Sequence, residues 1–170
     1  MRAFAVLLER LALTPSRNRK IEELVSYFRK TPDPDRGYAL AVLTGALSFD
    51  NVKAGRFKDI ALSTVDPHLF ALSYDYVGDL GETIALIWPH RTHDAPLPSL
   101  SEMVELLNTT SRMELGTLLA DLLSRGETNE RWALVKLATG ALRIGVSARL
   151  ARTALAQFGG RPLQEIEEVW

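Results

Sequence analysis

The chain of 170 residues contains no cysteine and no long apolar run. Without cysteine there is no disulfide, no thiolate metal site and no cysteine nucleophile, which favours a cytoplasmic protein. No apolar run reaches the roughly 20 residues that span a bilayer. The short apolar stretch at the N-terminus is interrupted by Glu9 and Arg10, and no small-residue cleavage site follows. We therefore expect neither a signal peptide nor a membrane partner.

Acidic residues are absent from one long window, between Arg131 and Gln164. The window holds six basic residues, although the formal net charge of the chain is only -1. Charge is segregated along the sequence: residues 1–60 carry +4, residues 61–130 carry -8 and residues 131–170 carry +3. Binding of a polyanion depends on the local field rather than on total charge. The segregation favours nucleic acid as a partner, and the alternative is chance scatter on a solvated surface.

The sequence also lacks a convincing β pattern, since no segment alternates polar and apolar residues with β-branched enrichment. Helical spacing dominates instead and predicts an all-α protein of about ten helices. Capping-box patterns at Ser99/Glu102 and Ser111/Glu114 mark two helix starts. The expected helices cover residues 2–13, 15–30, 38–47, 67–77, 80–88, 100–108, 112–125, 130–138, 147–158 and 162–170.

We expect one compact domain over residues 1–170, made of two helical halves at about 1–88 and 99–170. The proline-rich segment 89–98 is the predicted linker between them. Residues 36–47 resemble residues 131–142, and both segments end in Thr-Gly-Ala-Leu. Two similar halves packed back to back, each presenting one helix-end loop, would explain the likeness. Coincidence between two alanine-rich helices is the alternative.

The segment Thr139–Ser147 has the composition of an anion-binding loop. Gly140 is predicted to end a helix, Gly145 to make a turn and Ser147 to cap the next helix. Arg143 lies between the two glycines, where its guanidinium could join the free amides of a helix start at one phosphate. Residues 14–20 form a second basic helix start, in which the hydroxyls of Thr14 and Ser16 precede three cations.

No catalytic constellation is present. His90, His93 and Asp94 lie on the predicted linker and lack a fourth ligand, so we expect no metal site. Asp75 and Asp79 flank Gly78, and Asp79 is expected to cap the following helix. We find no Ser/His/Asp order, no phosphate-binding P-loop and no zinc-protease motif. The sequence therefore predicts a binding module with no cofactor of its own.

Three stretches carry a resemblance to a known family: residues 142–147 (Leu-Arg-Ile-Gly-Val-Ser), residues 75–83 and the closing residues 165–170. With Thr14–Asn18, they resemble the N-terminal DNA-binding domain of bacterial ATP-dependent DNA ligases. The resemblance implies an all-helical domain with two pseudo-twofold-related halves, which clamps nicked double-stranded DNA through its minor groove and phosphates. The DNA-binding residues that it implies are Gly140, Ala141, Arg143, Gly145 and Ser147 from one half, and Thr14, Ser16, Arg17 and Lys20 with Thr44 and Gly45 for the other. Relatives often carry lysine where this chain has Ala141, which predicts a weaker grip there.

The same resemblance predicts what the chain does not do. The catalytic Lys-x-Asp-Gly motif of the family is absent, and its nucleotidyltransferase domain is expected downstream of residue 170. ATP and Mg²⁺ are expected to belong to that catalytic domain of the parent enzyme. The implied partners are nicked duplex DNA and, in the same protein, the nucleotidyltransferase and OB-fold domains, in a monomeric, nucleoid-associated repair ligase. A helical protein-interaction module, whose acidic 61–130 surface binds a basic partner, is the alternative.

Overall fold

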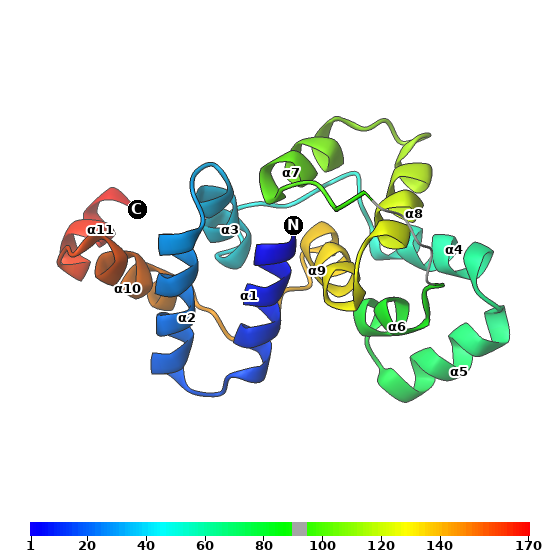
Figure 1. Ribbon diagram of the computed structural model, residues 1–170, viewed down its shortest axis with the longest axis horizontal. Coiled ribbons are helices and arrows are strands. Elements are labelled where there is room, and N and C mark those ends of the chain that lie inside the picture. The colour runs from blue at the N-terminus through cyan, green and yellow to red at the C-terminus, as the bar shows by residue number, and fades with distance from the viewer. Residues whose placement is uncertain (90–94) are drawn as a thin grey trace.

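The computed structural model describes residues 1–89 and 95–170, and all regular structure in them is helical (Figure 1). This confirms the all-α prediction, with eleven helices in the described residues rather than about ten. The helices are α1 (Arg2–Leu13), α2 (Arg17–Lys30), α3 (Asp35–Leu43), α4 (Ala54–Thr64), α5 (Pro67–Val77), α6 (Leu80–Ile87), α7 (Leu100–Thr109), α8 (Leu115–Arg125), α9 (Thr128–Thr139), α10 (Ala148–Gly159) and α11 (Leu163–Val169). None of them is long and apolar enough to cross a membrane.

Helix α4 is the element that the sequence pattern missed. Its N-cap, Lys53, makes no side-chain capping bond, and Gly55 lies in its first turn. The usual start signals are therefore absent. The helix is held instead by burial of Phe57, Ile60 and Ala61, which lie at helical spacing on its inner face.

Three helix starts lie slightly away from their predicted caps. Helix α8 begins at Leu115 with Glu114 as its N-cap, although the Ser111 hydroxyl accepts a hydrogen bond from the Glu114 amide at 3.3 Å. Helix α2 begins after Ser16 rather than Thr14, and the Ser16 hydroxyl accepts a hydrogen bond from the Arg19 amide at 3.4 Å. Helix α9 begins after Glu127 rather than Asn129, because Glu127 and Glu130 form a reciprocal capping box. The predicted capping box at Ser99 and Glu102 is confirmed, and so is the cap of α6 by Asp79.

The order of the helices repeats after 95 residues. Shifting α1–α5 by 95 positions places each of them over one of α7–α11 to within three residues at its start, and only α6 has no counterpart. The contacts repeat as well: α2 packs on α10 while α8 packs on α4, and α1 packs on α9 while α7 packs on α3. Such reciprocal pairing is what an approximate twofold relation between the halves produces.

The halves interlock rather than form two separate lobes. Helices α10 and α11 lie beside α2 and α3 on the left of Figure 1, and α4 and α5 lie with α8 and α9 on the right. The predicted linker at 89–98 therefore separates two sequence repeats, not two packed bodies. Residues 90–94 of this segment, with His90, His93 and Asp94, lie outside the described residues.

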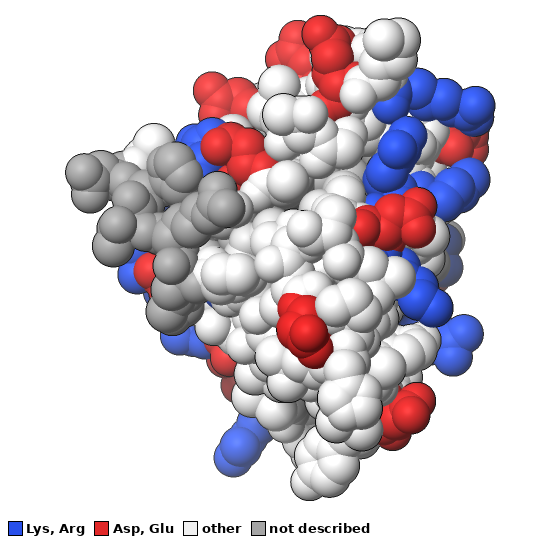
Figure 2. All heavy atoms as spheres, turned by 90° about the vertical axis from the view of Figure 1, so that its right-hand side faces the viewer, with Lys and Arg blue, Asp and Glu red and all other residues white. Residues whose placement is uncertain are grey.

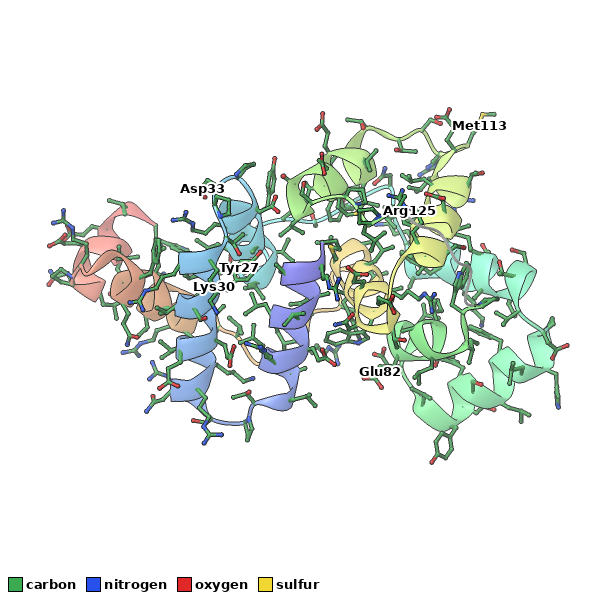
Figure 3. All side chains as sticks on the ribbon, in the orientation of Figure 1. Tyr27, Lys30, Asp33, Glu82, Met113 and Arg125 are labelled. Carbon is green, nitrogen blue, oxygen red and sulfur yellow. The ribbon has the colours of Figure 1, made fainter. Side chains whose placement is uncertain are left out.

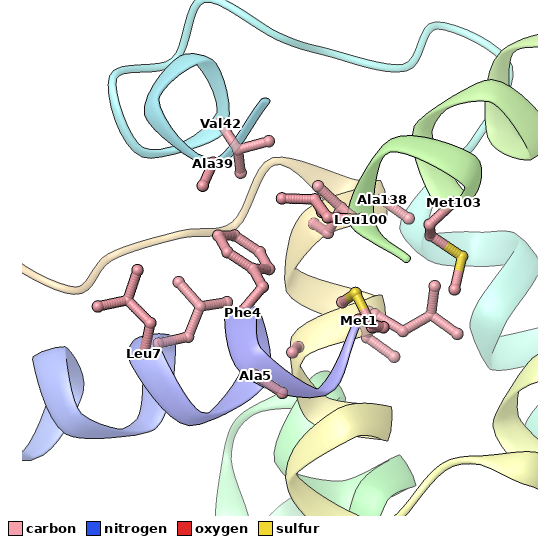
Figure 4. Packing of buried hydrophobic residues seen from close by; sticks show 14 of the residues in the cluster. Met1, Phe4, Ala5, Leu7, Ala39, Val42, Leu100, Met103 and Ala138 are labelled. Atoms are coloured by element: carbon pink, nitrogen blue, oxygen red, sulfur yellow. The ribbon is translucent and has the colours of Figure 1, made fainter. Parts of the chain in front are cut away.

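One hydrophobic core joins the two repeats. Figure 4 shows Met1 and Phe4 of the first repeat packed beside Leu100, Met103 and Ala138 of the second. The N-terminal ammonium adds a polar tie, because it donates a hydrogen bond to the Pro98 carbonyl at 2.6 Å. Core residues from both repeats hold α1 and α9 at the centre, and this places the loops after α3 and α9.

Candidate nucleic-acid interface

The loop after α9 is fixed to the protein core on one side and exposed to solvent on the other. Gly140 ends the helix with φ of +69°, and the Thr139 hydroxyl returns a hydrogen bond to the Val135 carbonyl at 2.6 Å. Ile144 is buried beneath the loop, whereas Arg143 on its outer side is exposed. The structure thus places a fixed backbone under an arginine that faces solvent.

The next helix begins directly after this loop. Ser147 caps α10 as predicted, and its hydroxyl accepts a hydrogen bond from the Leu150 amide at 3.2 Å. Gly140, Ala141, Gly145 and Ser147 are all exposed. Backbone amides, small residues and one guanidinium therefore share the same surface, which is a suitable arrangement for an anion.

Lys20 supports this loop from the inside. Only 8% of the residue is exposed, and its ammonium donates a hydrogen bond to the Ile144 carbonyl. Gly145 closes over the same amine: its φ is +68°, and a Cβ atom built there would lie 2.7 Å from Lys20 Nζ. The family resemblance assigned Lys20 to the opposite half, together with Thr44 and Gly45. In the structure Lys20 lies instead on the buried face of α2 with Leu24, facing α10, beside the loop after α9.

The start of α2 therefore belongs to the same corner as the loop after α9. Arg17 and Ser16 are exposed there, and Thr14 is half-buried. Neither Arg17 nor Arg143 pairs with an acidic side chain anywhere in residues 1–89 and 95–170. We call this region, formed by residues 14–20 and 139–147, the first corner.

The loop after α3 has the same local geometry one repeat earlier. The Thr44 hydroxyl bonds the Leu40 carbonyl at 2.8 Å, and Gly45 has φ of +75°. Thr44 is half-buried and Gly45 is exposed. Phe49 is buried at the position of Ile144, and the exposed Ser48 replaces Arg143. The two Thr-Gly helix ends thus share the threonine hydroxyl bond to the preceding turn and the positive φ of the glycine, but they differ in charge.

The partner of this loop is the segment before α8, whose residues sequence reasoning did not include among the candidate DNA contacts. Thr109, Ser111 and Arg112 lie 95 residues after Thr14, Ser16 and Arg17. Arg17 is the first residue of α2, whereas Arg112 lies three residues before α8 begins at Leu115. Ser111 and Arg112 are exposed, and Arg56 of α4 donates a hydrogen bond to the Arg112 carbonyl at 3.1 Å. Residues 44–56 and 109–112 form the second corner. Extending the offset of the 36–47 likeness back to Arg17 would have found Arg112.

Not every cation of the acid-free window reaches the surface. Arg131 is buried, and its Nε donates to the Leu123 carbonyl at 2.7 Å. Lys136 pairs with Asp79. Arg152 lies 3.9 Å from Glu167 and stacks on the Trp170 ring. The window thus mixes structural cations with the exposed Arg143 and Arg149.

The surface charge is uneven on the whole molecule. In Figure 2, Lys and Arg side chains gather along the right-hand edge, which is the far side of Figure 1. The broad central face of that view is largely uncharged, with scattered acidic groups. Within the part of the chain that the structure describes, no cluster of three or more metal-ligating side chains occurs.

Comparison with known proteins identifies the family of the chain. A family model described as DNA ligase N terminus matches residues 1–156, which is most of the chain and includes both corners. A search of curated protein sequences finds no match. The chain belongs to the family of N-terminal, non-catalytic domains of ATP-dependent DNA ligases.

Proposed function

We propose that this domain binds duplex DNA without sequence preference, through phosphate and minor-groove contacts, and holds it for the catalytic part of a ligase. The observation that carries the proposal is the repeated corner. Each corner combines an exposed arginine at or just before a helix start with a helix end at which the threonine is half-buried and the glycine exposed, and the two corners are related by the 95-residue repeat. Two such sites on one rigid core suit a ligand that presents phosphates at regular spacing.

Backbone recognition fits the residue types. Arg17, Arg143 and Arg112 supply charge, which fixes position on DNA but carries no sequence information. Gly140 and Gly145 have no side chain, so the loop backbone can approach a groove wall closely. In this proposal Lys20 positions the loop and does not itself contact phosphate, because its ammonium is engaged with Ile144.

The wider setting is proposed on family membership. The DNA is a nicked duplex, and the domain acts with nucleotidyltransferase and OB-fold domains of the same bacterial repair ligase. On the same ground, ATP and Mg²⁺ would serve the nucleotidyltransferase domain.

The test measures binding of the 170-residue chain to intact and nicked duplexes of unrelated sequences, with fluorescence anisotropy as the readout. We expect similar affinities across sequences and a fall of about tenfold or more between 50 and 200 mM salt. Arg143→Ala should weaken binding about tenfold, because one charge-assisted contact is lost, without changing the melting temperature.

Arg29→Ala is the matched control. Arg29 is exposed and lies in the last turn of α2, at the opposite end from Arg17. It should leave affinity unchanged. Salt-insensitive binding, or equal losses for Arg29→Ala and Arg143→Ala, would argue against the proposal.

A further inference from the structure

A groove lies where α1, α6 and α9 meet, away from the Thr-Gly loops. Its volume is about 550 Å³. The lining residues come from all three helices: Glu9, Ala12, Leu13, Glu82, Ala85, Leu86, Glu127, Thr128, Asn129 and Trp132. Figure 3 places Glu82 at the lower margin of the molecule, between α1 and α6. The groove contains the N-terminal end of α9, whereas the first corner contains its C-terminal end. A helix of 12 residues separates these ends by about 18 Å.

The groove presents apolar side chains that the fold does not use. Leu13 is 77% exposed and Leu86 is 66% exposed, and they come from different helices. Ala12 and Ala85 leave room between them, and the Trp132 indole forms part of the lining. One exposed leucine is ordinary on a protein surface, but apolar groups from three helices along one hollow are typical of a binding groove.

The charge of the groove is of one sign. Glu9 lies in α1, Glu82 lies in α6 and Glu127 is the N-cap of α9, and the lining contains no lysine or arginine. This is the acidic part of the chain, since residues 61–130 carry -8. The closing helix of a second copy would not fit, because α11 carries Glu165, Glu167 and Glu168 and would meet like charges.

We propose that this groove docks a basic amphipathic helix of a partner protein. Leucine-type side chains at positions i, i+4 and i+7 of the helix would cover Leu13, Leu86 and Trp132, and flanking Lys or Arg would face the three glutamates. The proposal does not depend on DNA binding, and the two can fail separately.

The test uses a designed 18-residue helical peptide with a leucine stripe and lysines on its flanks. A second peptide has the same stripe with glutamate in place of lysine. Binding to the ¹⁵N-labelled chain is followed through the three tryptophan indole resonances, with Trp132 assigned from a Trp132→Phe variant. We expect the basic peptide to shift the Trp132 resonance and to leave those of Trp88 and Trp170 in place. The acidic peptide should bind at least about tenfold more weakly.

Substitutions on α6 test the location. Leu86→Ser and Glu82→Lys should each weaken the basic peptide at least about fivefold, because they remove apolar contact or reverse one charge. The matched controls are Leu72→Ser on α5 and Glu105→Lys on α7, which are exposed and outside the groove. They should have no effect, and Leu86→Ser should keep full duplex affinity. Equal binding of both peptides, or equal losses in groove and control variants, would overturn the proposal.

Discussion

At the residue scale, burial decides what each cation does. Arg131, Lys136 and Arg143 belong to the same acid-free window, yet they have different surroundings. Arg131 is buried, and desolvation lowers the pKa of its guanidinium. Lys136 pairs with Asp79, and Arg143 is exposed. From the sequence alone all three cations are equal candidates for surface contacts, because the sequence does not show which side of a helix meets the core.

Lys20→Met should separate support of the loop from contact with DNA. Methionine keeps the length and the apolar stem of the lysine but leaves the Ile144 carbonyl without its donor. We expect stability to fall by about 1–3 kcal/mol and duplex affinity to fall as well, because the loop loses its fixed shape. Urea unfolding and hydrogen exchange of residues 141–147 measure the first effect, and fluorescence anisotropy measures the second.

The salt dependence of duplex affinity distinguishes the two possible roles of Lys20, which are support of the loop and direct contact with phosphate. A residue that only positions the loop should leave the slope of log affinity against log salt unchanged, whereas a phosphate contact contributes about one unit. Lys30→Met, at the exposed C-terminal end of α2, serves as control. If Lys20→Met lowers the slope by about one and leaves loop exchange unaltered, Lys20 is a direct DNA contact.

At the element scale, several helix starts with local capping chemistry were predicted correctly, whereas the caps of α2 and α9 lie two residues from those expected. Ser99, Asp79 and Ser147 cap the helices expected of them, because an N-cap bond involves residues only three apart. Helix α4 lacks such a signal and forms because Phe57 and Ile60 find a core. Tertiary packing supplies most of the stability of a short helix, and a sequence pattern reports it poorly.

The ion pair between Asp79 and Lys136 joins the start of α6 to α9. Asp79→Asn should therefore lower the free energy of unfolding, and the size of the loss should depend on pH. Burial acts to raise the pKa of Asp79, but hydrogen bonds from Lys136 and from the Glu82 amide outweigh it and lower the pKa. Asparagine can still cap α6 but cannot pair with Lys136. Near pH 7 we expect a loss of about 1–2 kcal/mol in the free energy of unfolding.

The pH dependence follows from the direction of the shift. A lowered folded-state pKa stabilises the protein above the unfolded-state pKa, and this stabilisation is lost as pH falls through the folded-state value. The difference between wild type and Asp79→Asn should therefore shrink below about pH 4. Urea melts from pH 7 to pH 3 measure it. Asp75→Asn, which alters an exposed carboxylate on α5, is the control, and a pH-independent difference would contradict the electrostatic account.

At the scale of the whole molecule, the repeat places two corners on one core. When the two repeats are compared by residue identity, only the likeness of residues 36–47 to residues 131–142 stands out, because most other positions 95 apart carry different residues. They keep their burial instead: Phe28 and Leu123 are both buried, and so are Phe49 and Ile144. Burial tolerates exchange among apolar residues, so the repeat persists in structure after it fades from the sequence.

Arg112→Ala should show whether both corners bind. If they do, Arg112→Ala and Arg17→Ala should each lower the salt slope by about one unit, and the double variant by about two. The Arg112 carbonyl, which Arg56 bonds, survives the substitution, so the melting temperature should not change. Anisotropy titrations from 50 to 200 mM salt measure the slopes. A normal slope for Arg112→Ala beside a reduced one for Arg17→Ala would restrict binding to the first corner.

The sequence by itself determined the helical class, most helix ends and the family, since these rest on periodicity, local capping and short motifs. It also indicated the exposed Arg143 and the glycines beside it. Only the tertiary structure decided that Lys20 lies under the loop and that acidic and apolar groups of three helical elements meet in one groove. These facts depend on contacts between residues tens of positions apart, and such contacts are fixed by core packing rather than by local pattern.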